Sequence, residues 1–434
     1  MRTRVLLLLS ILLYAFASQD ASSPTRPLAD ESLAVEEAIP SEPAVAERPQ
    51  LRVATYNASL NRDKAGQFIE ELQAGDNEQA KTVAEIIQRV RPDILLLNEF
   101  DRDDRGSPHA SLAAELFQDH YLSVAQGEAE PISYPHVYVP TVNTGIASGF
   151  DLDNNGKVVD KPGSPSFAND ALGFGRHSGQ YGMLLLSQYP IDFDHVRTFQ
   201  KFLWRVMPDA MLPDDLETDE RADFYSPEEL DVLRLSSKNH CDVPVRVGEA
   251  TLHVLIAHPT PPVFDGPEDH HGHRNHDEIR LWADYISPDR SAYIIDDDGR
   301  AGGLREDAMF VILGDYNADP FDGDSTDFAI RQLLDHPRID TSDLPESEGA
   351  RTHRFAETGP GADHQGDPAH DTADFSFFGN GPGNLRVDYV LPSKHGLRQL
   401  DAGVFWPVWD DPIAKRVADA SDHRLVYVDL EIVP

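Results

Sequence analysis

The sequence has one cysteine, Cys241, among its 434 residues. No intrachain disulfide bond can form, so packing or bound metal must provide the stability that disulfides give to many exported proteins. Basic residues are also scarce, because 37 Lys and Arg stand against 75 Asp and Glu and the formal net charge is −38. Such a charge repels polyanions, and no Lys/Arg-rich or aromatic-basic run offsets it. Sequence-independent binding of nucleic acid to a basic surface is therefore disfavoured.

The apolar run at the N-terminus, residues 5–16, is too short to span a bilayer comfortably, and no cysteine follows that would carry a lipid. Two arginines precede the run, and small residues follow it around Ala17. This pattern is typical of a secretory signal peptide. We therefore expect residues 1–18 to be removed, the protein to be secreted or periplasmic, and the mature chain to have no integral membrane anchor.

Residues 19–49 are rich in Ala, Pro, Ser and Glu and contain no aromatic residue. They show no sustained period of 2 or 3.6 residues, which predicts a disordered tether. The chain as a whole is 40% hydrophobic, enough to bury a core well beyond minimal domain size. From Leu51 onward, apolar runs alternate with turn signals without a second Pro-rich break or an internal repeat. We expect a single domain over residues 50–434.

Several apolar runs in this domain lead into a polar residue. LRVATYN ends in Asn57, DILLLNE in Glu99, LHVLIAH in His258 and FVILGD in Asp315. Such runs are typical of strands buried on both faces, and the 3.6-residue period of EQAKTVAEIIQRVRPD predicts a helix between the first two. Each polar residue alone would be an ordinary strand end. Together they indicate an α/β layered domain whose strand ends gather at one edge, where ligands of such folds bind.

Seven motifs occur in order along this domain: ATYN, LNEF, GQYGMLLLSQYPI, AHPTP, GDYNADP, RVDYVLPS and SDHRLVYVDL. In this order they resemble the endonuclease/exonuclease/phosphatase superfamily, from about Leu51 to Val433. The resemblance implies an α/β fold, a four-layer sandwich of two packed mixed β-sheets flanked by helices. It also implies cleavage of phosphoester bonds with a divalent metal.

A phosphate ester repels nucleophiles, so its hydrolysis needs a cation, an acceptor for a proton of water and a donor for the leaving oxygen. Glu99 and Asn57 are hard oxygen ligands suited to Mg²⁺ or Mn²⁺. The resemblance adds Asp422 as a further metal ligand. Asn98 departs from the family pattern, because members commonly have Gln before the metal-binding Glu. We expect the shorter amide to shift the groups behind the metal slightly.

The remaining roles also follow from the resemblance. Asp315 is expected to orient and deprotonate the attacking water, while Asn317 holds water or a phosphoryl oxygen. His423, paired with Asp388, would stabilise the pentavalent transition state or assist proton transfer. His258 would protonate the leaving group or bind phosphate.

The triplet SDH at 421–423 has a plainer interpretation as a turn before an edge strand. Apolar residues alternate over 426–432, as they do in strands with one exposed face. Because the triplet occurs together with the other six motifs, we favour the catalytic interpretation.

Two long insertions, at about 105–178 and 192–240, interrupt the core that minimal family members have. Such loops lie around the active edge and usually set substrate choice. The first contains DLDNNGKVVD, in which oxygen-bearing residues alternate before a glycine, as at the start of a calcium loop. The twelfth position is Pro162 and not Glu, which argues against a full EF-hand. A looser structural Ca²⁺ site and a simple Asx-rich turn remain the alternatives. The candidate ligands are Asp151, Asp153, Asn155 and Asp160.

Four histidines lie within seven residues of FDGPEDHHGHRNHDEIRLWADYI, ahead of an apparent helix. They are His270, His271, His273 and His276. They indicate either a transition-metal site or a solvated loop that caps the helix. A separate hypothesis is that Arg274 and His276 return to the active edge and bind a terminal phosphate. The same hypothesis applies to Lys238 and His240 in LSSKNHCDVPV.

Three functions are compatible with these patterns. The first is a secreted metal-dependent phosphatase or phosphodiesterase for small or lipid-derived phosphoesters, with Mg²⁺ or Mn²⁺ as the catalytic ion and Ca²⁺ in a structural or catalytic role. The second is a secreted nuclease of the deoxyribonuclease type, which the lack of basic runs disfavours. The third is a non-catalytic binding protein, disfavoured because each aligned catalytic position has a competent residue. The large insertions favour a closed pocket over an open duplex-binding face, so we expect the first function.

Overall fold

The computed structural model describes residues 50–102, 111–376 and 381–433. The predicted signal peptide and tether, residues 1–18 and 19–49, lie outside the described residues. No helix in the described part of the chain combines the length and apolar character needed to cross a membrane.

In the described residues, six strands form the first sheet in the order β12-β13-β1-β2-β4-β3. They are β1 Gln50–Asn57, β2 Ile94–Asn98, β3 His136–Tyr138, β4 Met183–Ser187, β12 Leu397–Phe405 and β13 Leu425–Ile432. Strand β1 pairs in parallel with β2 and antiparallel with β13, so the sheet is mixed.

Strand β13 lies between β12 and β1, so the edge-strand interpretation of residues 426–432 is wrong. Its alternation has another cause, because the two faces of the strand meet different surroundings. Val426 and Val428 are buried between the two sheets. On the other face, Asp429 forms an ion pair with Arg52, whose guanidinium also lies over the ring of Tyr427.

The second sheet has the order β11-β8-β7-β6-β5 within the described residues. Its strands are β5 Arg197–Thr198, β6 Cys241–Val247, β7 Ala250–Ile256, β8 Met309–Asp315 and β11 Asp388–Pro392. Strands β7 and β8 are parallel, and the other neighbours are antiparallel. A short ribbon of β9 Ala373–Asp374 and β10 Asn384–Leu385 lies outside both sheets.

The two sheets pack face to face around a shared apolar cluster. Val53 and Leu96 from the first sheet and Val254 and Val311 from the second are fully buried in it. Burial of these side chains removes apolar surface from water and holds the sheets together. The expectation of core strands buried on both faces is confirmed.

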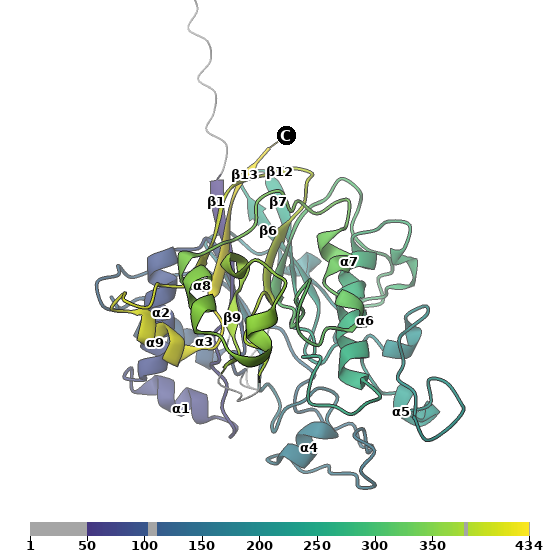
Figure 1. The fold of residues 1–434 in the computed structure, drawn as a ribbon. Coiled ribbons are helices and arrows are strands. Elements are labelled where there is room, and N and C mark those ends of the chain that lie inside the picture. Colours follow the sequence, from purple (N-terminus) through teal and green to yellow (C-terminus); the bar gives the residue numbers. More distant parts are fainter. Residues whose placement is uncertain (1–49, 103–110, 377–380, 434) are drawn as a thin grey trace, which may run out of the picture. The chain divides into compact units, whose positions relative to one another are not determined.

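Helices cover the outer face of each sheet, which completes the predicted four-layer α/β sandwich (Figure 1). Helices α1, α2, α3 and α9 share an apolar core with the first sheet, and α6 shares one with the second. The helices are α1 Gln67–Gln73, α2 Glu78–Val90, α3 Leu112–Phe117, α4 Pro165–Asn169, α5 Pro227–Leu230, α6 His270–Tyr285, α7 Arg331–Leu334, α8 Glu348–His353 and α9 Ala414–Ala420.

Helix α2 is the helix that the sequence predicts between β1 and β2. The side chain of Asn77 caps its first turn by accepting a hydrogen bond from the backbone N–H of Ala80. The helix ends at Arg91, which has a left-handed φ of 54° and precedes Pro92. Its periodic apolar residues face the first sheet, and Val83 and Ile87 are fully buried there.

Helix α6 begins at His270, so the four histidines lie in its first two turns. The alternative of a solvated loop ahead of the helix is wrong, because all four histidines belong to the helix. Two of their rings also have partners in the preceding segment. The His270 ring lies 2.7 Å from a carboxylate oxygen of Glu268, and the His271 ring lies 2.7 Å from the carbonyl oxygen of Val263. In the described part of the chain, the histidines form no group of three ligand atoms close enough for a metal.

Candidate active site

Polar residues at the ends of core strands meet where the two sheets join. Asn57 ends β1, Glu99 follows β2 and Asp315 ends β8. The Nδ2 amide of Asn57 donates a hydrogen bond to Oδ2 of Asp315 at 3.0 Å. This bond joins the first sheet to the second at the edge where the sequence places the site.

Asn98, which departs from the family pattern, connects three strands behind this edge. Its buried Oδ1 accepts a hydrogen bond from the backbone N–H of Asp315 at 3.3 Å. Its Nδ2 donates to the carbonyl oxygen of Ala257 at 3.4 Å. The shorter amide therefore anchors β2 against β7 and β8.

Gly314 lets the chain carry Asp315 close to the end of β7. A Cβ atom at this position would lie 2.1 Å from the backbone carbonyl oxygen of Ala257, well inside van der Waals contact. Any larger residue would force β7 and β8 apart next to the site.

Two imidazoles converge on one carboxylate oxygen of Asp315. Its Oδ2 lies 3.5 Å from Nε2 of His258 and 3.7 Å from Nε2 of His423. Its Oδ1 accepts the backbone N–H of Asn317 at 2.9 Å. Asp315 is 1% exposed, so this arrangement places a carboxylate and two proton-transfer groups in a nearly dry environment.

His423 is held by the second carboxylate, Asp388. The ring Nδ1 of His423 lies 2.9 Å from Oδ2 of Asp388, and the hydroxyl of Thr372 donates to the same oxygen at 2.9 Å. Burial lowers the pKa of His423, but the nearby carboxylates, led by Asp388 and Asp315, outweigh it and raise this pKa well above its usual value. The ring is therefore an imidazolium at neutral pH.

His258 has the opposite electrostatics. Burial lowers its pKa well below the usual value, and the charges of Lys238 and His423 add to the effect. Its Nδ1 is buried and has no hydrogen-bond partner in the described residues. His258 is thus a neutral ring at neutral pH, which favours hydrogen bonding to phosphate over protonation of the leaving group in the resting site.

Glu99 combines an unusual backbone with an unusual charge state. Its φ of 58° lies in the left-handed region that non-glycine residues rarely adopt, as is common at functional sites. Asn61 donates to its Oε2 at 2.7 Å. Burial raises the pKa of Glu99 to about 7, with further contributions from Asp422 and Asp315. Like-charged oxygens gathered in this way form a hard donor set that a divalent cation would neutralise.

Asn57 and Asp422 complete this donor set through a shared contact. The backbone N–H of Ser59 donates to Oδ1 of Asn57 at 3.2 Å, and the Ser59 hydroxyl donates to Oδ1 of Asp422 at 3.2 Å. Oxygen ligands of this kind fit Mg²⁺ or Mn²⁺. Ser59, which no sequence motif marks, thus contacts both candidate ligands.

Among the described residues, two groups of three acidic or histidine side chains have ligand atoms within 4.8 Å of one another. The first group is Asp315, Asp388 and His423. Both ring nitrogens of its histidine face a carboxylate, so hydrogen bonding and charge pairing account for the closeness. The second group, Asp151, Asp153 and Asp170, lies in the first insertion.

Asp170 is a member of the second group that the sequence does not reveal, because it follows the DLDNNG motif at a distance. Its carboxylate accepts the backbone N–H groups of Leu152 at 3.0 Å and Val159 at 2.7 Å, which folds the loop over it. Asp151 accepts the N–H groups of Asn155 and Gly156, and Asp153 accepts the N–H of Asn155 two residues on, as in an Asx turn. The predicted ligand Asp160 is not part of this group.

The four candidate phosphate-binding residues differ in how their polar groups are used. Both ring nitrogens of His240 are within hydrogen-bond distance of partners in the fold. Arg274 donates to three backbone carbonyl oxygens, and the His276 ring lies 3.1 Å from Asp277. His240 and Arg274 hold the insertions against α6, whereas the His276 ring pairs within α6 itself. Lys238 alone of the four has no such partner in the described residues.

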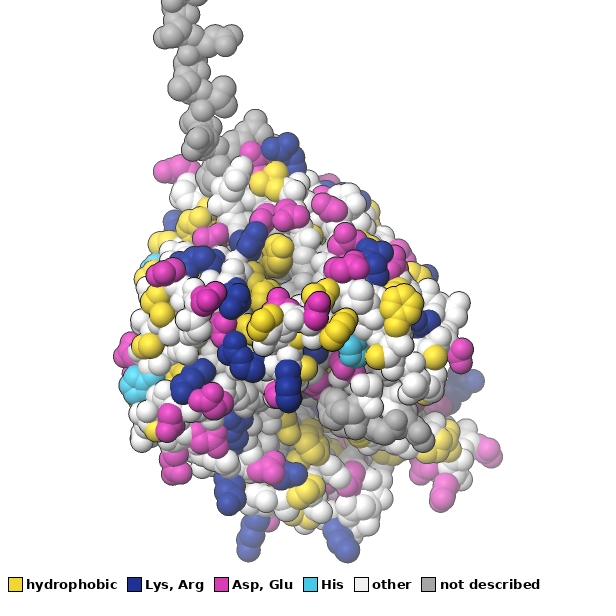
Figure 2. Space-filling model, turned by 60° about the vertical axis from the view of Figure 1, so that its left-hand side comes forward, with side chains coloured by type: hydrophobic (Ala, Val, Ile, Leu, Met, Phe, Trp, Pro, Cys, Tyr) yellow, Lys and Arg dark blue, Asp and Glu magenta, His cyan; other side chains and the backbone are white. Residues whose placement is uncertain are grey.

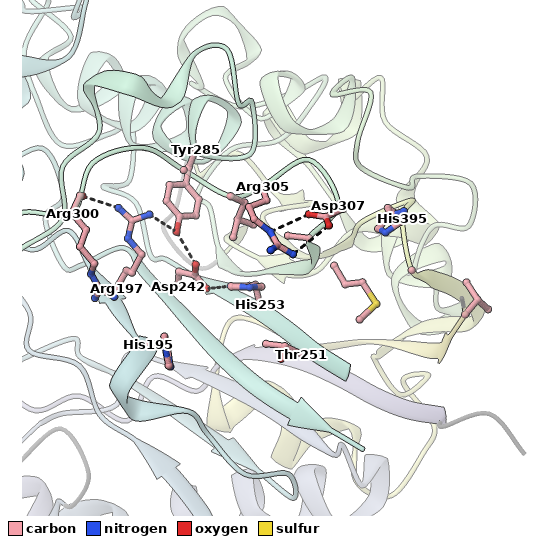
Figure 3. A pocket seen from close by; sticks show the side chains of 16 residues that line it. His195, Arg197, Asp242, Thr251, His253, Tyr285, Arg300, Arg305, Asp307 and His395 are labelled. Atoms are coloured by element: carbon pink, nitrogen blue, oxygen red, sulfur yellow. Dashed lines mark hydrogen bonds and ion pairs between the residues drawn. The ribbon is translucent and has the colours of Figure 1, made fainter. Parts of the chain in front are cut away.

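A cavity of about 670 Å³ lies elsewhere in the domain (Figure 3). Its lining includes Met309, the first residue of β8, whereas Asp315 is the last, so the cavity is at the opposite end of that strand. Its central polar groups bind one another. Tyr285 donates to Asp242 at 2.7 Å, and the His253 ring lies 2.8 Å from the other oxygen of this carboxylate.

Comparison with known proteins agrees with the motifs. The model of the Endonuclease/Exonuclease/phosphatase family matches residues 54–423. No curated protein matches the chain. An endonuclease/exonuclease/phosphatase from Beutenbergia cavernae DSM 12333 is similar in structure, with 18% identity, a TM-score of 0.47, and coverage of 89% of this chain and 72% of that one.

Two further solved structures show weaker likenesses. Sphingomyelinase C from Streptomyces griseocarneus has 13% identity, a TM-score of 0.43, and coverage of 88% of this chain and 99% of that one. The human Nocturnin catalytic domain with bound sulfate has 15% identity, a TM-score of 0.42, and coverage of 89% and 94%. The family match spans most of the sequence, and the chain therefore belongs to the endonuclease/exonuclease/phosphatase family, whose members are metal-dependent phosphoester hydrolases.

Proposed function

We propose that the protein is a secreted phosphatase or phosphodiesterase that acts on small or lipid-derived phosphoesters by in-line attack of water on phosphorus. The convergence of His258 and His423 on one oxygen of Asp315, beside the donor set of Glu99, carries this proposal. Export rests on the N-terminal pattern of the sequence alone.

Glu99, Asn57 and Asp422 would hold Mg²⁺ or Mn²⁺, which when bound supplies positive charge to the phosphoryl oxygens. Asp315 accepts a proton from the attacking water, since its Oδ2 faces the site and its position is held by Asn57. Asn317 donates its Nδ2 to the carbonyl oxygen of Pro259, so its side-chain oxygen remains for binding water.

The other groups stabilise charge on the phosphoryl oxygens. His423 is a buried imidazolium whose Nδ1 is fixed by Asp388, so its Nε2–H points to the region of Asp315. Such a preorganised donor stabilises the negative charge of the transition state without reorganisation. His258 adds a neutral ring 3.5 Å from the same carboxylate oxygen of Asp315.

Surface charge supports a small substrate over nucleic acid. The face in Figure 2 carries acidic and basic side chains interspersed, with no broad basic surface on that side. The net charge of −38 adds long-range repulsion of polyanions. A nuclease of the deoxyribonuclease type remains the second candidate, since both reactions use the same kind of centre.

A substrate panel distinguishes these functions. Purified protein is incubated with plasmid DNA, phospholipids, sugar phosphates, an aryl phosphate and a bis-aryl phosphate, each with Mg²⁺, Mn²⁺, Ca²⁺ or chelator. We expect hydrolysis of a small or lipid-derived ester that requires Mg²⁺ or Mn²⁺ and stops with chelator. Rapid nicking of the plasmid would replace our proposal with the nuclease. Failure to cleave any substrate with any metal would favour a non-catalytic binding protein.

We further propose that the group of Asp151, Asp153 and Asp170 binds a structural Ca²⁺. An ion that binds only the native state stabilises it by mass action, by about 2.7 kcal/mol at a free concentration of 100 Kd. We therefore expect millimolar Ca²⁺ to raise the melting temperature by several degrees, measured by scanning calorimetry.

The double variant Asp151→Asn, Asp153→Asn should lose this Ca²⁺ response and keep its melting temperature in chelator close to that of the wild type. An equal response of variant and wild type would place the ion elsewhere. No response in the wild type would leave the loop as an Asx-rich turn.

A further inference from the structure

Lys238 is a buried cation that has no partner among the residues that the structure describes. It lies just before β6 and is 6% exposed. In the described part of the chain, its ammonium has no ion pair within 4.0 Å and no hydrogen bond. A lysine buried without a partner is costly, so such residues are normally paired with an acid or a ligand.

The surroundings of Lys238 place it beside the candidate active site. Burial lowers its pKa, and three carboxylates oppose this effect, in the order Glu278, Glu99 and Asp315. Two of the three are the proposed metal ligand and the proposed base. Lys238 also contributes to the lowered pKa of His258. Its ammonium therefore lies near the position of a phosphoryl group bound between the metal ligand and the base.

Glu278 of α6 holds this part of the site in place. Its two carboxylate oxygens accept the backbone N–H of Ser237 at 2.8 Å and the backbone N–H of Thr260 at 2.6 Å. The fully buried side chain thus connects the segment that carries Lys238 to the segment that follows His258.

Three further polar groups around this connection are buried and unsatisfied. The hydroxyls of Ser237 and Thr260 and the Nδ1 of His258 have no hydrogen-bond partner among the described residues. Buried polar groups in native proteins are almost always hydrogen-bonded, so a cluster of exceptions beside an unpaired cation indicates a bound polar partner.

We infer that Lys238, together with these unsatisfied groups, binds the terminal dianionic phosphate of a phosphomonoester and selects monoesters over diesters. The inference rests on the proposed hydrolase function and narrows its substrate class. A monoester offers three non-bridging oxygens and a second negative charge. In a diester, one of these oxygens carries a carbon chain, which would have to lie against an ammonium and two hydroxyls that need polar partners.

The nearby Arg274 cannot take this role. It is close enough to contribute to the lowered pKa of Lys238, but its guanidinium is committed to three backbone carbonyl oxygens. The side chain of Lys238 is thus the group whose charge is available to a ligand.

The test compares p-nitrophenyl phosphate with bis(p-nitrophenyl) phosphate for the wild type, Lys238→Met and Lys238→Arg. The exposed Lys201→Met serves as a matched control for loss of a lysine. We expect the wild type to prefer the monoester in kcat/KM. Lys238→Met should lower the ratio of monoester to diester kcat/KM by about tenfold or more, mainly through KM, as loss of a charged hydrogen bond predicts. Lys238→Arg should retain most of the preference, and Lys201→Met all of it.

Binding of inorganic phosphate, measured by calorimetry in the presence of Mg²⁺, gives a readout separate from turnover. Lys238→Met should weaken it by about tenfold. Equal losses on both esters with unchanged phosphate affinity would overturn the inference. A wild type that prefers the diester would also overturn it, yet leave the hydrolase function intact. Absence of hydrolysis would contradict the proposed function, and phosphate affinity would still decide the role of Lys238.

Discussion

His423→Ala is expected to lower turnover by at least about 10³-fold with every divalent metal, since loss of one preorganised donor to transition-state charge costs about 10²- to 10³-fold and a proton-transfer role adds to this. The imidazolium lies between Asp388, at 2.9 Å, and Asp315, at 3.7 Å. No cation in solution can replace a charge aimed from this buried position. The measurement is steady-state hydrolysis across Mg²⁺, Mn²⁺ and Ca²⁺, after circular dichroism has confirmed folding.

Asp388→Asn serves as the matched variant, because it keeps His423 and removes the charge that most raises its pKa. Its loss lowers that pKa, so the imidazolium is lost at a lower pH. The alkaline limb of the pH–rate profile should therefore move to lower pH, with activity best preserved on the acid side. Near-normal turnover of His423→Ala with any metal would contradict the assigned role.

Asp315→Asn is expected to lower turnover by roughly 10²-fold or more, as loss of a general base typically does, with little change in metal affinity. The substitution keeps the shape of the side chain, and the amide oxygen can still accept the hydrogen bond that Asn57 donates at 3.0 Å. What the variant loses is the capacity to take a proton from water.

Glu99→Gln provides the contrast, because it changes a proposed metal ligand in the same site. It should raise the metal concentration needed for half-maximal activity and be partly rescued by excess Mg²⁺ or Mn²⁺. In the double variant Asp315→Asn, Glu99→Gln, the loss of turnover should be far from the sum of the two single losses in activation free energy, since both residues act in one transition state. Near-normal turnover of Asp315→Asn in a metal titration would show that β8 ends in an acid for structural reasons.

Local pattern was enough to predict the layered fold. A continuous apolar run such as residues 310–314 predicts a strand with both faces buried. The 3.6-residue period of apolar side chains over residues 78–90 predicts an amphipathic helix. Both patterns depend only on neighbours in sequence. The residues at strand ends, including Asn57, Glu99 and Asp315, could be named for the same reason. Their meeting at one edge also required the two sheets to pack together, because β1 and β2 lie in one sheet and β8 in the other.

Contacts between distant segments were decided by the tertiary structure. The alternation of apolar residues over 426–432 could not show that β13 is an internal strand. Apolar residues alternate in an edge strand, and they also alternate in an internal strand whose two faces meet different surroundings. Nor could the loop motif reveal Asp170, because this residue is distant from the motif in sequence. It comes close to Asp151 only in the folded insertion, where its carboxylate accepts the backbone N–H of Leu152.

Side-chain charge was the least predictable property. Lys238, His240 and Arg274 all appeared as phosphate-binding candidates in the sequence. Packing against α6 gives hydrogen-bond partners to His240 and Arg274 but leaves Lys238 without one in the described ranges. The sequence by itself determined which chemical groups the active edge contains. Only the packing of the two sheets and the insertions decided which of those groups are charged, satisfied or free, because burial and distance to other charges set those properties.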